Sequence, residues 1–288
     1  MKTEIYSDEV NMDYTKVISG ELLKGKKGLI MGAANDKSIA WGIAKAAHAN
    51  GATLAYTYQG EILKKRIIPL AEQTGSSMYY ECDVSKEESL DELFEKITKE
   101  LGHLDFLVHS IGFSNKDELR GEYLDTSLEN FLMTMHISCY SFTSIARRAA
   151  PLMKDGGSML TMSYYGAQKV MPHYNVMGIA KSALETSVQY LAVDLGARNI
   201  RVNAISAGPI KTLAASGIGD FRYILKWNEY NSPLKRTVTT EEVGNTAVYL
   251  LSNMSSATTG QTVYVDSGYN VVGMKAIDAP DITLEQGE

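Results

Sequence analysis

Two tyrosines and one lysine near the middle of the chain have the types and the spacing that could do chemistry. Tyr164 comes just after a short apolar run. Tyr174 follows it ten residues later, and Lys181 another seven residues later. A phenol has an unperturbed pKa of about 10, and a nearby ammonium lowers that pKa. On a helix, residues seven apart lie about two turns apart on one face. The spacing therefore predicts a tyrosine that is activated by a lysine.

The elements that must position these side chains are read from hydrophobic periodicity. Apolar runs predict strands at residues 28–32, 52–59, 78–84, 104–112, 159–162, 200–208 and 262–266. Longer amphipathic stretches predict helices that begin near residues 39 and 86 and helices at 61–73, 128–152, 174–197 and 240–251. Ser38 and Ser85 are expected to cap the helices that follow them. Residues 211–231 are mixed in polarity and are expected to be irregular.

Strands that alternate with helices and are joined by short loops form right-handed βαβ units and a parallel sheet. The predicted fold class is therefore α/β, a single Rossmann-type domain with a doubly wound, seven-stranded parallel sheet and helices on both faces. The domain is expected to cover residues 24–274. Residues 1–23 are expected to form a flexible extension, and the acidic residues 275–288 a loose tail.

Composition excludes several classes of function. The formal net charge of −6 argues against nucleic-acid binding, which needs a basic surface. The two cysteines, Cys82 and Cys139, stand in dissimilar contexts and the five histidines are scattered, so no metal site is expected. The N-terminal residues lack the pattern of a signal peptide, and no apolar run is long enough to span a membrane. A soluble, cytoplasmic protein is expected.

Small and polar residues stand where the predicted strands end, at the edge where an open parallel sheet binds its ligand. The first turn, 32–42, departs from the usual glycine spacing, but its small residues leave room for a pyrophosphate on the helix amides. Gln59 could bond a ribose hydroxyl, and no basic residue follows it directly, which favours NADH over NADPH. Asp83 and Val84 are expected beside adenine, and residues 110–112 beside the nicotinamide ribose.

A second pair, Tyr165 and Lys169, has the Tyr-x-x-x-Lys spacing of most short-chain dehydrogenases. In those families the pair lies within a helix, about thirty residues before a Gly-Pro or Pro-Gly turn. Here Lys181 precedes Pro209 by about that distance, whereas Lys169 lies in the loop before the helix. The Tyr165–Lys169 spacing is therefore interpreted as a coincidence.

With these motifs the chain resembles the divergent branch of the short-chain dehydrogenase/reductase family, and within it the bacterial enoyl-[acyl-carrier-protein] reductases. The resemblance covers roughly residues 23–274 and has no counterpart to residues 1–18. Its most specific marks are Ser163-Tyr164 and Tyr174-x6-Lys181. Supporting motifs are Gly32-x5-Ser38-Ile39-Ala40, Ser110-Ile111-Gly112-Phe113 and the stretch from Ala207 to Ala215.

The resemblance implies that hydride from NADH reduces the trans-2 double bond of an enoyl thioester on acyl carrier protein, the last step of fatty-acid elongation. Tyr174 would donate to the developing oxyanion, Lys181 would hold the ribose hydroxyls, and Tyr164 would lie near the thioester. The cofactor-binding residues that it implies are Gly32, Ser38, Ile39, Gln59, Asp83, Val84, Ser110, Ile111, Gly112, Lys181, Pro209, Ile210, Thr212 and Ala214. The implied substrate-binding residues are Phe113, Ser114, Tyr164, Tyr174, Met177, Ile218, Phe221 and Ile224.

The stretch 211–231 resembles the family's substrate-binding loop, and Ile218, Phe221 and Ile224 are spaced as one apolar face of a short helix. Basic side chains in and after this stretch could meet the acidic carrier protein. They are Lys211, Arg222, Lys226, Lys235 and Arg236. The family also implies a homotetramer, with the helices 128–152 and 174–197 as packing faces.

Two other functions stay open at this point. A carbonyl or alcohol dehydrogenase on the same fold would use Tyr165 and Lys169, or would tolerate the wider pair. A non-catalytic NAD-binding sensor or scaffold would need no acid at the nicotinamide, and the complete set of Tyr164, Tyr174 and Lys181 argues against it.

Overall fold

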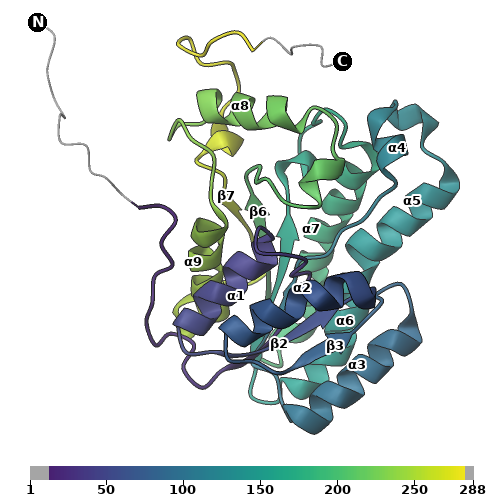
Figure 1. Cartoon of the computed structure of the whole chain (residues 1–288), viewed down its shortest axis with the longest axis vertical. Coiled ribbons are helices and arrows are strands. Elements are labelled where there is room, and N and C mark those ends of the chain that lie inside the picture. Colours follow the sequence, from purple (N-terminus) through teal and green to yellow (C-terminus); the bar gives the residue numbers. More distant parts are fainter. Residues whose placement is uncertain (1–12, 283–288) are drawn as a thin grey trace, which may run out of the picture.

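A seven-stranded parallel sheet forms the centre of the molecule, as predicted (Figure 1). The computed structural model describes residues 13–282. The strands are β1 (Lys27–Met31), β2 (Thr53–Tyr58), β3 (Tyr79–Glu81), β4 (Phe106–His109), β5 (Gly157–Ser163), β6 (Ile200–Ala207) and β7 (Thr262–Val265). Their order in the sheet is β3-β2-β1-β4-β5-β6-β7. The chain thus moves outward from β1 to β3 and returns to place β4 on the other side of β1, so the topological switch point lies between β1 and β4.

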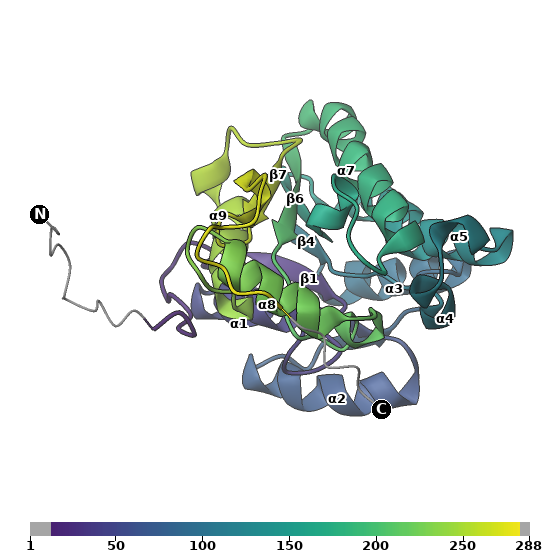
Figure 2. The same cartoon turned by 90° about the horizontal axis from the view of Figure 1, so that it is seen from above.

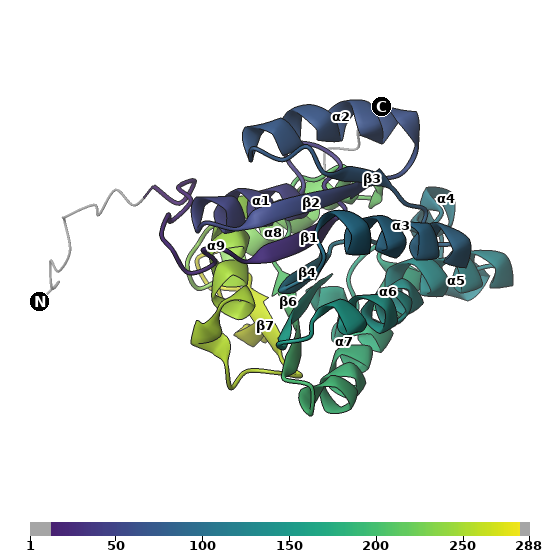
Figure 3. The same cartoon turned by 90° about the horizontal axis from the view of Figure 1, so that it is seen from below.

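Helices cover both faces of the sheet (Figure 3). They are α1 (Ile39–Ala49), α2 (Gly60–Gln73), α3 (Glu87–Glu100), α4 (Lys116–Arg120), α5 (Leu128–Met135), α6 (Ser141–Ala149), α7 (Asn175–Gly196), α8 (Phe221–Asn231) and α9 (Thr240–Leu251). One buried cluster joins α1, α2 and α9 to one face of the sheet, and a second joins α3, α6 and α7 to the other. The doubly wound arrangement is confirmed.

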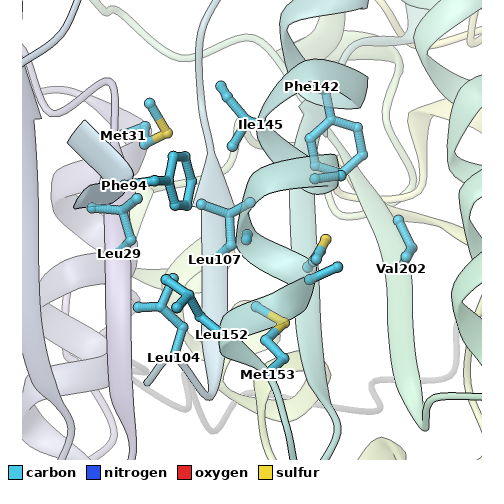
Figure 4. Packing of buried hydrophobic residues seen from close by; sticks show 14 of the residues in the cluster. Leu29, Met31, Phe94, Leu104, Leu107, Phe142, Ile145, Leu152, Met153 and Val202 are labelled. Atoms are coloured by element: carbon cyan, nitrogen blue, oxygen red, sulfur yellow. The ribbon is translucent and has the colours of Figure 1, made fainter. Parts of the chain in front are cut away.

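The strands are apolar along most of their length because both of their faces are buried. Leu29 of β1 and Leu107 of β4 point toward Phe94 of α3 and Ile145 of α6 on the same side of the sheet (Figure 4). Fully burying one such side chain stabilises the fold by about 1.5–3 kcal/mol relative to leaving it exposed. This packing holds the strand ends, and the loops that follow them, in fixed positions.

Several predicted boundaries are wrong, because apolar runs extend past the point where strand pairing stops. β3 ends at Glu81 and β4 at His109, so Asp83 and Ser110 lie in the loops that follow. The helix predicted at 128–152 consists of α5, a π-helical turn at His136–Tyr140, α6 and a final 3-10 turn. A π-helical turn shifts the side chains of a helix by one position and is frequent at functional sites.

The two capping predictions fail in their hydrogen bonds. Ser38 directly precedes α1, but its hydroxyl donates to the carbonyl of Asn35 and does not accept from the helix. The residue before α3 is Lys86, and the Ser85 hydroxyl donates to the Asp83 carboxylate. In both cases the hydroxyl is oriented by a hydrogen bond to an acceptor in the preceding turn.

The stretch 211–231 is more ordered than the irregular conformation predicted for it. It contains a 3-10 turn at Ala215–Gly217 and then α8, which lies across the molecule in the view from above (Figure 2). Its buried residues are Ile224, Asn228 and Asn231. The spacing of Ile218, Phe221 and Ile224 indicated a short helix, but α8 begins only at Phe221 and continues to Asn231. Polar residues at its buried positions hide this continuation from a reading of hydrophobic periodicity.

The part of the N-terminal extension that the structure describes lies against the domain. The amide of Ile18 donates to the Asn245 side chain of α9 at 3.0 Å. The guanidinium of Arg236 lies over the ring of Tyr14, 3.7 Å from its centroid, and Leu23 is fully buried. Residues 1–12 of the predicted extension and 283–288 of the predicted tail lie outside the described residues. Among residues 13–282, no helix is long and apolar enough to cross a membrane.

Candidate active site

The loop after β5 and the start of α7 bring the predicted site residues together. Tyr164 directly follows β5, and Tyr174 is the residue before the first turn of α7. Their rings meet edge to face, with centroids 5.0 Å apart and an interplanar angle of 73°. Lys181 extends from α7 toward β5, where its Nζ donates to the carbonyl of Met162 at 2.8 Å. Tyr174 and Lys181 are both nearly fully buried.

The expected activation of Tyr174 by Lys181 is not what the structure shows. Burial raises the pKa of Tyr174 well above its ordinary value, and Tyr164 and Glu185 add to the increase. Burial also lowers the pKa of Lys181 to about 8. The lysine head is directed at a backbone carbonyl, and desolvation dominates the environment of the phenol. Tyr174 is therefore a neutral phenol that can donate a hydrogen bond.

Two glycines allow the Tyr164 loop to approach α7 closely. A Cβ on Gly166 would lie 2.3 Å from Cδ1 of Tyr174, so only glycine leaves room for the ring. A Cβ on Gly178 would lie 2.8 Å from the carbonyl oxygen of Gly166. Ser182, one turn beyond Gly178, donates to the carbonyl of Ala167. The first two turns of α7 therefore fix the position of the loop, and this role of the glycines was not predicted.

A buried carboxylate holds both ends of the same loop. Glu185 accepts a short hydrogen bond from the hydroxyl of Ser163 and a second one, at 3.3 Å, from the side-chain amide of Gln168. Tyr164 lies between these two attachment points. Its own hydroxyl is enclosed and has no hydrogen-bond partner among the described residues. A buried hydroxyl without a partner costs free energy, so an oxygen of a bound substrate would be a stabilising acceptor there.

The loop after β4 lies beside Lys181. A Cβ on Gly112 would lie 3.7 Å from Nζ of Lys181 and 3.4 Å from Cε of Met177, which places this backbone against the site. The hydroxyl of Ser138 accepts from the amide of Phe113 at 2.9 Å and donates to its carbonyl at 3.0 Å. Ser138 belongs to the π-helical turn, so the shifted side chain holds the loop. Sequence reasoning missed Ser138, because Thr134, Ser141 and Ser144 lie on neighbouring turns of the same stretch and no local pattern distinguishes Ser138 from them.

The turn after β1 has the close packing that a dinucleotide site needs. Gly32 has a φ of +96°, and a Cβ there would lie 2.0 Å from the carbonyl oxygen of Ser110. The loops after β1 and β4 thus touch at the switch point, where backbone amides can approach a pyrophosphate. Ser38 and Ile39 stand at the start of α1, whose free amides and dipole favour an anion. The residues present fit a dinucleotide.

The other predicted cofactor residues lie on the same edge of the sheet. Gln59 is exposed between β2 and α2, and Val84 is buried in the loop after β3. The carboxylate of Asp83 accepts from the amide of Ser85 at 3.0 Å. The nearest basic candidate, Lys64, pairs with Glu61 at 3.1 Å. Its ammonium also lies over the ring of Tyr58, the last residue of β2, 6.0 Å from the ring centroid, so this cation is already engaged by a carboxylate and an aromatic ring.

The segment after β6 carries the remaining predicted cofactor residues. Pro209 is buried, Ile210 is half-buried and Ala214 is exposed. The amide of Thr212 donates to the carbonyl of Ile210 at 2.8 Å, and its hydroxyl accepts from the amide of Ala215 at 3.1 Å. The segment therefore follows a defined turn as it leaves the sheet.

The predicted substrate residues differ in their surroundings. Phe113 is 53% exposed, whereas Ile224 of α8 is buried. Ile218 precedes α8, so Ile218 and Phe221 do not continue one helical face, although both are half-buried. Ser114 is buried, and its hydroxyl accepts from Thr134 at 2.9 Å within a polar network that includes Asn130. Its side chain is thus already engaged.

The side chains of the competing pair have different surroundings, although the amide of Lys169 donates to the carbonyl of Tyr165 at 3.1 Å. The hydroxyl of Tyr165 donates to the carbonyl of Asn270 at 3.2 Å, and its ring packs against Tyr264 and Tyr269. Lys169 is exposed in the loop before α7. This geometry agrees with the interpretation that the Tyr-x-x-x-Lys spacing is a coincidence. Among the described residues no group of histidine, cysteine, aspartate and glutamate side chains could hold a metal ion.

Comparison with known proteins agrees with the geometry. A family model described as enoyl-(acyl carrier protein) reductase matches residues 32–270. Enoyl-[acyl-carrier-protein] reductase [NADH] 1 of Rhizobium meliloti is 65% identical over 263 residues, which are 91% of this chain and 97% of the relative.

Two solved structures of enoyl-acyl-carrier-protein reductases are also similar. The enzyme of Anaplasma phagocytophilum in complex with NAD has a TM-score of 0.88 and 60% identity, over 93% of this chain and 100% of that one. The Bacillus cereus enzyme with NADP+ and an indole naphthyridinone has a TM-score of 0.87 and 49% identity, over 88% of this chain and 100% of that one. The chain therefore belongs to the enoyl-[acyl-carrier-protein] reductase family.

Proposed function

We propose that this protein reduces the trans-2 double bond of enoyl thioesters carried on acyl carrier protein, with NADH as the reductant, in the last step of the fatty-acid elongation cycle. Family membership supports the reaction, and relatives with high identity are named for NADH. The observation that carries the proposal in this chain is the edge-to-face contact of Tyr164 and Tyr174, with Lys181 bound to the Met162 carbonyl of the preceding strand.

NADH supplies the hydride when it is bound, and the protein supplies position and electrostatics. Reduction places negative charge on the thioester oxygen, and a preorganised donor at that oxygen is commonly the largest electrostatic contribution to such a step. The neutral phenol of Tyr174 is the donor in this proposal. Its surroundings exclude water, which strengthens the hydrogen bond, because the local dielectric constant is low.

Tyr164 and Lys181 complete the proposed site. The hydroxyl of Tyr164, which has no partner among residues 13–282, would bond the substrate next to Tyr174. The Lys181 ammonium keeps a positive charge within a buried site and lies beside Gly112, where the nicotinamide ribose is expected. Gly32, Ser38 and Ile39 would receive the pyrophosphate, and Gln59 the adenosine ribose.

We also propose that the protein is a cytoplasmic homotetramer. Large apolar side chains are exposed on two helices that were expected to pack between subunits: Leu128 and Leu132 on α5, and Ile179, Tyr190 and Val193 on α7. Covering such surfaces with other subunits would remove them from water. A mass measurement in solution that gives only a monomer at working concentration would contradict this part.

The acyl carrier protein is the proposed partner that presents the substrate. Lys211, Arg222 and Lys226 are exposed, the last two on α8 and Lys211 in the segment between β6 and α8. A local basic surface can attract an acidic partner even when the net charge of the enzyme is −6.

The experiment that tests the reaction follows the loss of NADH absorbance with a trans-2-enoyl thioester. Parallel reactions contain NADPH in place of NADH, or a 3-ketoacyl thioester in place of the enoyl substrate. Enoyl-dependent oxidation of NADH supports both the reaction and the cofactor. Turnover of the keto substrate alone would instead favour a carbonyl reductase.

A further inference from the structure

Tyr174 stands between two residues with left-handed backbone conformation. His173 has a φ of +55° and Asn175 a φ of +37°, a region that residues other than glycine enter infrequently. Such strain persists only where surrounding contacts fix it, and it concentrates at functional sites. The contacts of the two side chains therefore show which segments are joined to the residues on either side of the phenol.

On one side, Asn175 is bound to the end of α4. Its side-chain amide donates to the carbonyl of Gly121 at 2.8 Å and lies 3.3 Å from the carbonyls of Glu118 and Leu119. These are carbonyls that the short helix leaves without a partner of its own. The start of α7 is therefore fixed to α4.

On the other side, His173 is bound to the start of α8. Its Nε2 donates to Oδ2 of Asp220 at 3.1 Å. Asp220 immediately precedes α8 and is itself left-handed, with a φ of +51°. A Cβ on Gly219 would lie 3.1 Å from the His173 ring, so the backbone before α8 packs against the histidine. The two left-handed residues thus face each other across the contact.

We propose that His173 and Asp220 form a clasp that fixes the segment 211–231 against Tyr174, and that both are positioning residues for the acyl substrate. The inference rests on the proposed function, because it assigns Tyr174 to the oxyanion and this segment to the acyl chain. Through one hydrogen bond, the residue next to the donor sets where Ile218, Phe221 and Ile224 lie. The clasp therefore governs substrate affinity more than the chemical step.

The test compares His173→Ala, Asp220→Ala and the double variant with the unmodified enzyme, using a trans-2-dodecenoyl thioester and saturating NADH. Each single variant is expected to raise the KM about three- to tenfold, the effect of losing one hydrogen bond, with kcat almost unchanged. The double variant is expected to equal either single variant, since both remove the same bond. The clasp would be overturned if the KM increase of the double variant equalled the product of the two single increases. An unchanged KM in the single variants would overturn it as well.

Two further variants separate the clasp from a general loosening of the fold. Asp220→Asn keeps an acceptor oxygen and tolerates the left-handed conformation, so it is expected to retain a near-normal KM. Asp278→Ala breaks a 3.0 Å ion pair with Lys235 beyond the other end of α8 and is expected to change nothing. A KM that rises as much in Asp278→Ala as in Asp220→Ala would contradict a specific role for the clasp.

Limited trypsin digestion gives a readout that does not depend on turnover. Lys211, Arg222 and Lys226 are exposed cleavage sites on the clasped segment. Cleavage there is expected to become several-fold faster in His173→Ala and Asp220→Ala and to stay unchanged in Asp278→Ala. If the unmodified enzyme reduced no enoyl thioester, the proposed function would fail, and this digestion would still decide whether the clasp exists.

Discussion

The ring of Tyr164 meets the ring of Tyr174 edge to face at a centroid distance of 5.0 Å, although the two residues belong to different elements. One follows β5 and the other precedes α7. Gly166 makes this contact possible, because any larger residue there would collide with the Tyr174 ring. The contact therefore joins the loop after β5 to the start of α7 within the candidate site.

Removing the phenol of Tyr174 should damage catalysis. Tyr174→Phe is expected to lower kcat/KM for an enoyl thioester by about 10²–10³-fold, the usual cost of one lost oxyanion donor. Tyr165→Phe serves as the matched control, because the Tyr165 hydroxyl donates to Asn270 outside the proposed site. Tyr165→Phe is expected to change kcat/KM by no more than about 0.5 kcal/mol, or roughly twofold. The reverse pattern would favour a carbonyl dehydrogenase that uses Tyr165 and Lys169.

Filling the space at Gly166 should displace Tyr174 without changing any reactive group. Gly166→Ala would place a Cβ 2.3 Å from the ring, so both activity and the free energy of unfolding are expected to fall, the latter by about 1–3 kcal/mol. Gly196→Ala is the control on α7, where a Cβ would meet no heavy atom within 4 Å. That change is expected to be neutral or to stabilise by about 0.4–1 kcal/mol. Denaturant unfolding and steady-state kinetics measure both effects.

The charge of Lys181 should make cofactor binding depend on pH. Its pKa is about 8 in the folded enzyme, so the ammonium is lost as the pH rises through that value. The kcat/KM for NADH reports groups of the free enzyme and is expected to decline above about pH 8. Lys181→Met should have a low kcat/KM for NADH at every pH, and its kcat/KM should not decline above pH 8. A variant that keeps the same pH profile would show that another group causes it.

The same lysine should affect stability in alkaline solution. The folded pKa lies below the ordinary value of 10.5, so between about pH 8 and that value the unfolded chain binds more protons than the folded one. Stability therefore rises with pH across that window. The stability difference between the unmodified enzyme and Lys181→Met should shift in favour of the unmodified enzyme, by at most about 1.4 kcal/mol per pH unit. Unfolding by urea at several pH values measures this shift.

His109 should contribute to loss of stability in acid. It is fully buried between the hydroxyls of Thr161 and Ser141, and burial, together with Lys181, lowers its pKa to about 3. Because its folded pKa lies below its ordinary value of 6.5, the unfolded chain binds the extra proton first, and stability falls as the pH drops below about 6.5. His109→Gln should lose less stability between pH 7 and pH 5. Equal losses in both proteins would exclude His109 as the cause.

The sequence alone determined the class of fold, the family and the identity of the candidate site residues. Local hydrophobic periodicity is a property of consecutive residues, so the seven strands and most helices could be predicted from it. The motifs around Tyr164, Tyr174 and Lys181 carried the family resemblance, which the comparisons confirmed. Strand ends and α8 were less predictable, because the end of strand pairing and the burial of Asn228 depend on neighbours that are distant in sequence.

Only the tertiary structure decided the electrostatics and the support of the site. The spacing of Tyr174 and Lys181 predicted a lowered phenol pKa, but the fold buries the phenol and directs the ammonium at Met162, so the pKa rises. Desolvation depends on all the atoms around a group, and no local pattern reports it. The contacts of Ser138 with Phe113 and of His173 with Asp220 likewise join segments far apart in the chain. Their partners became visible only when the chain was folded.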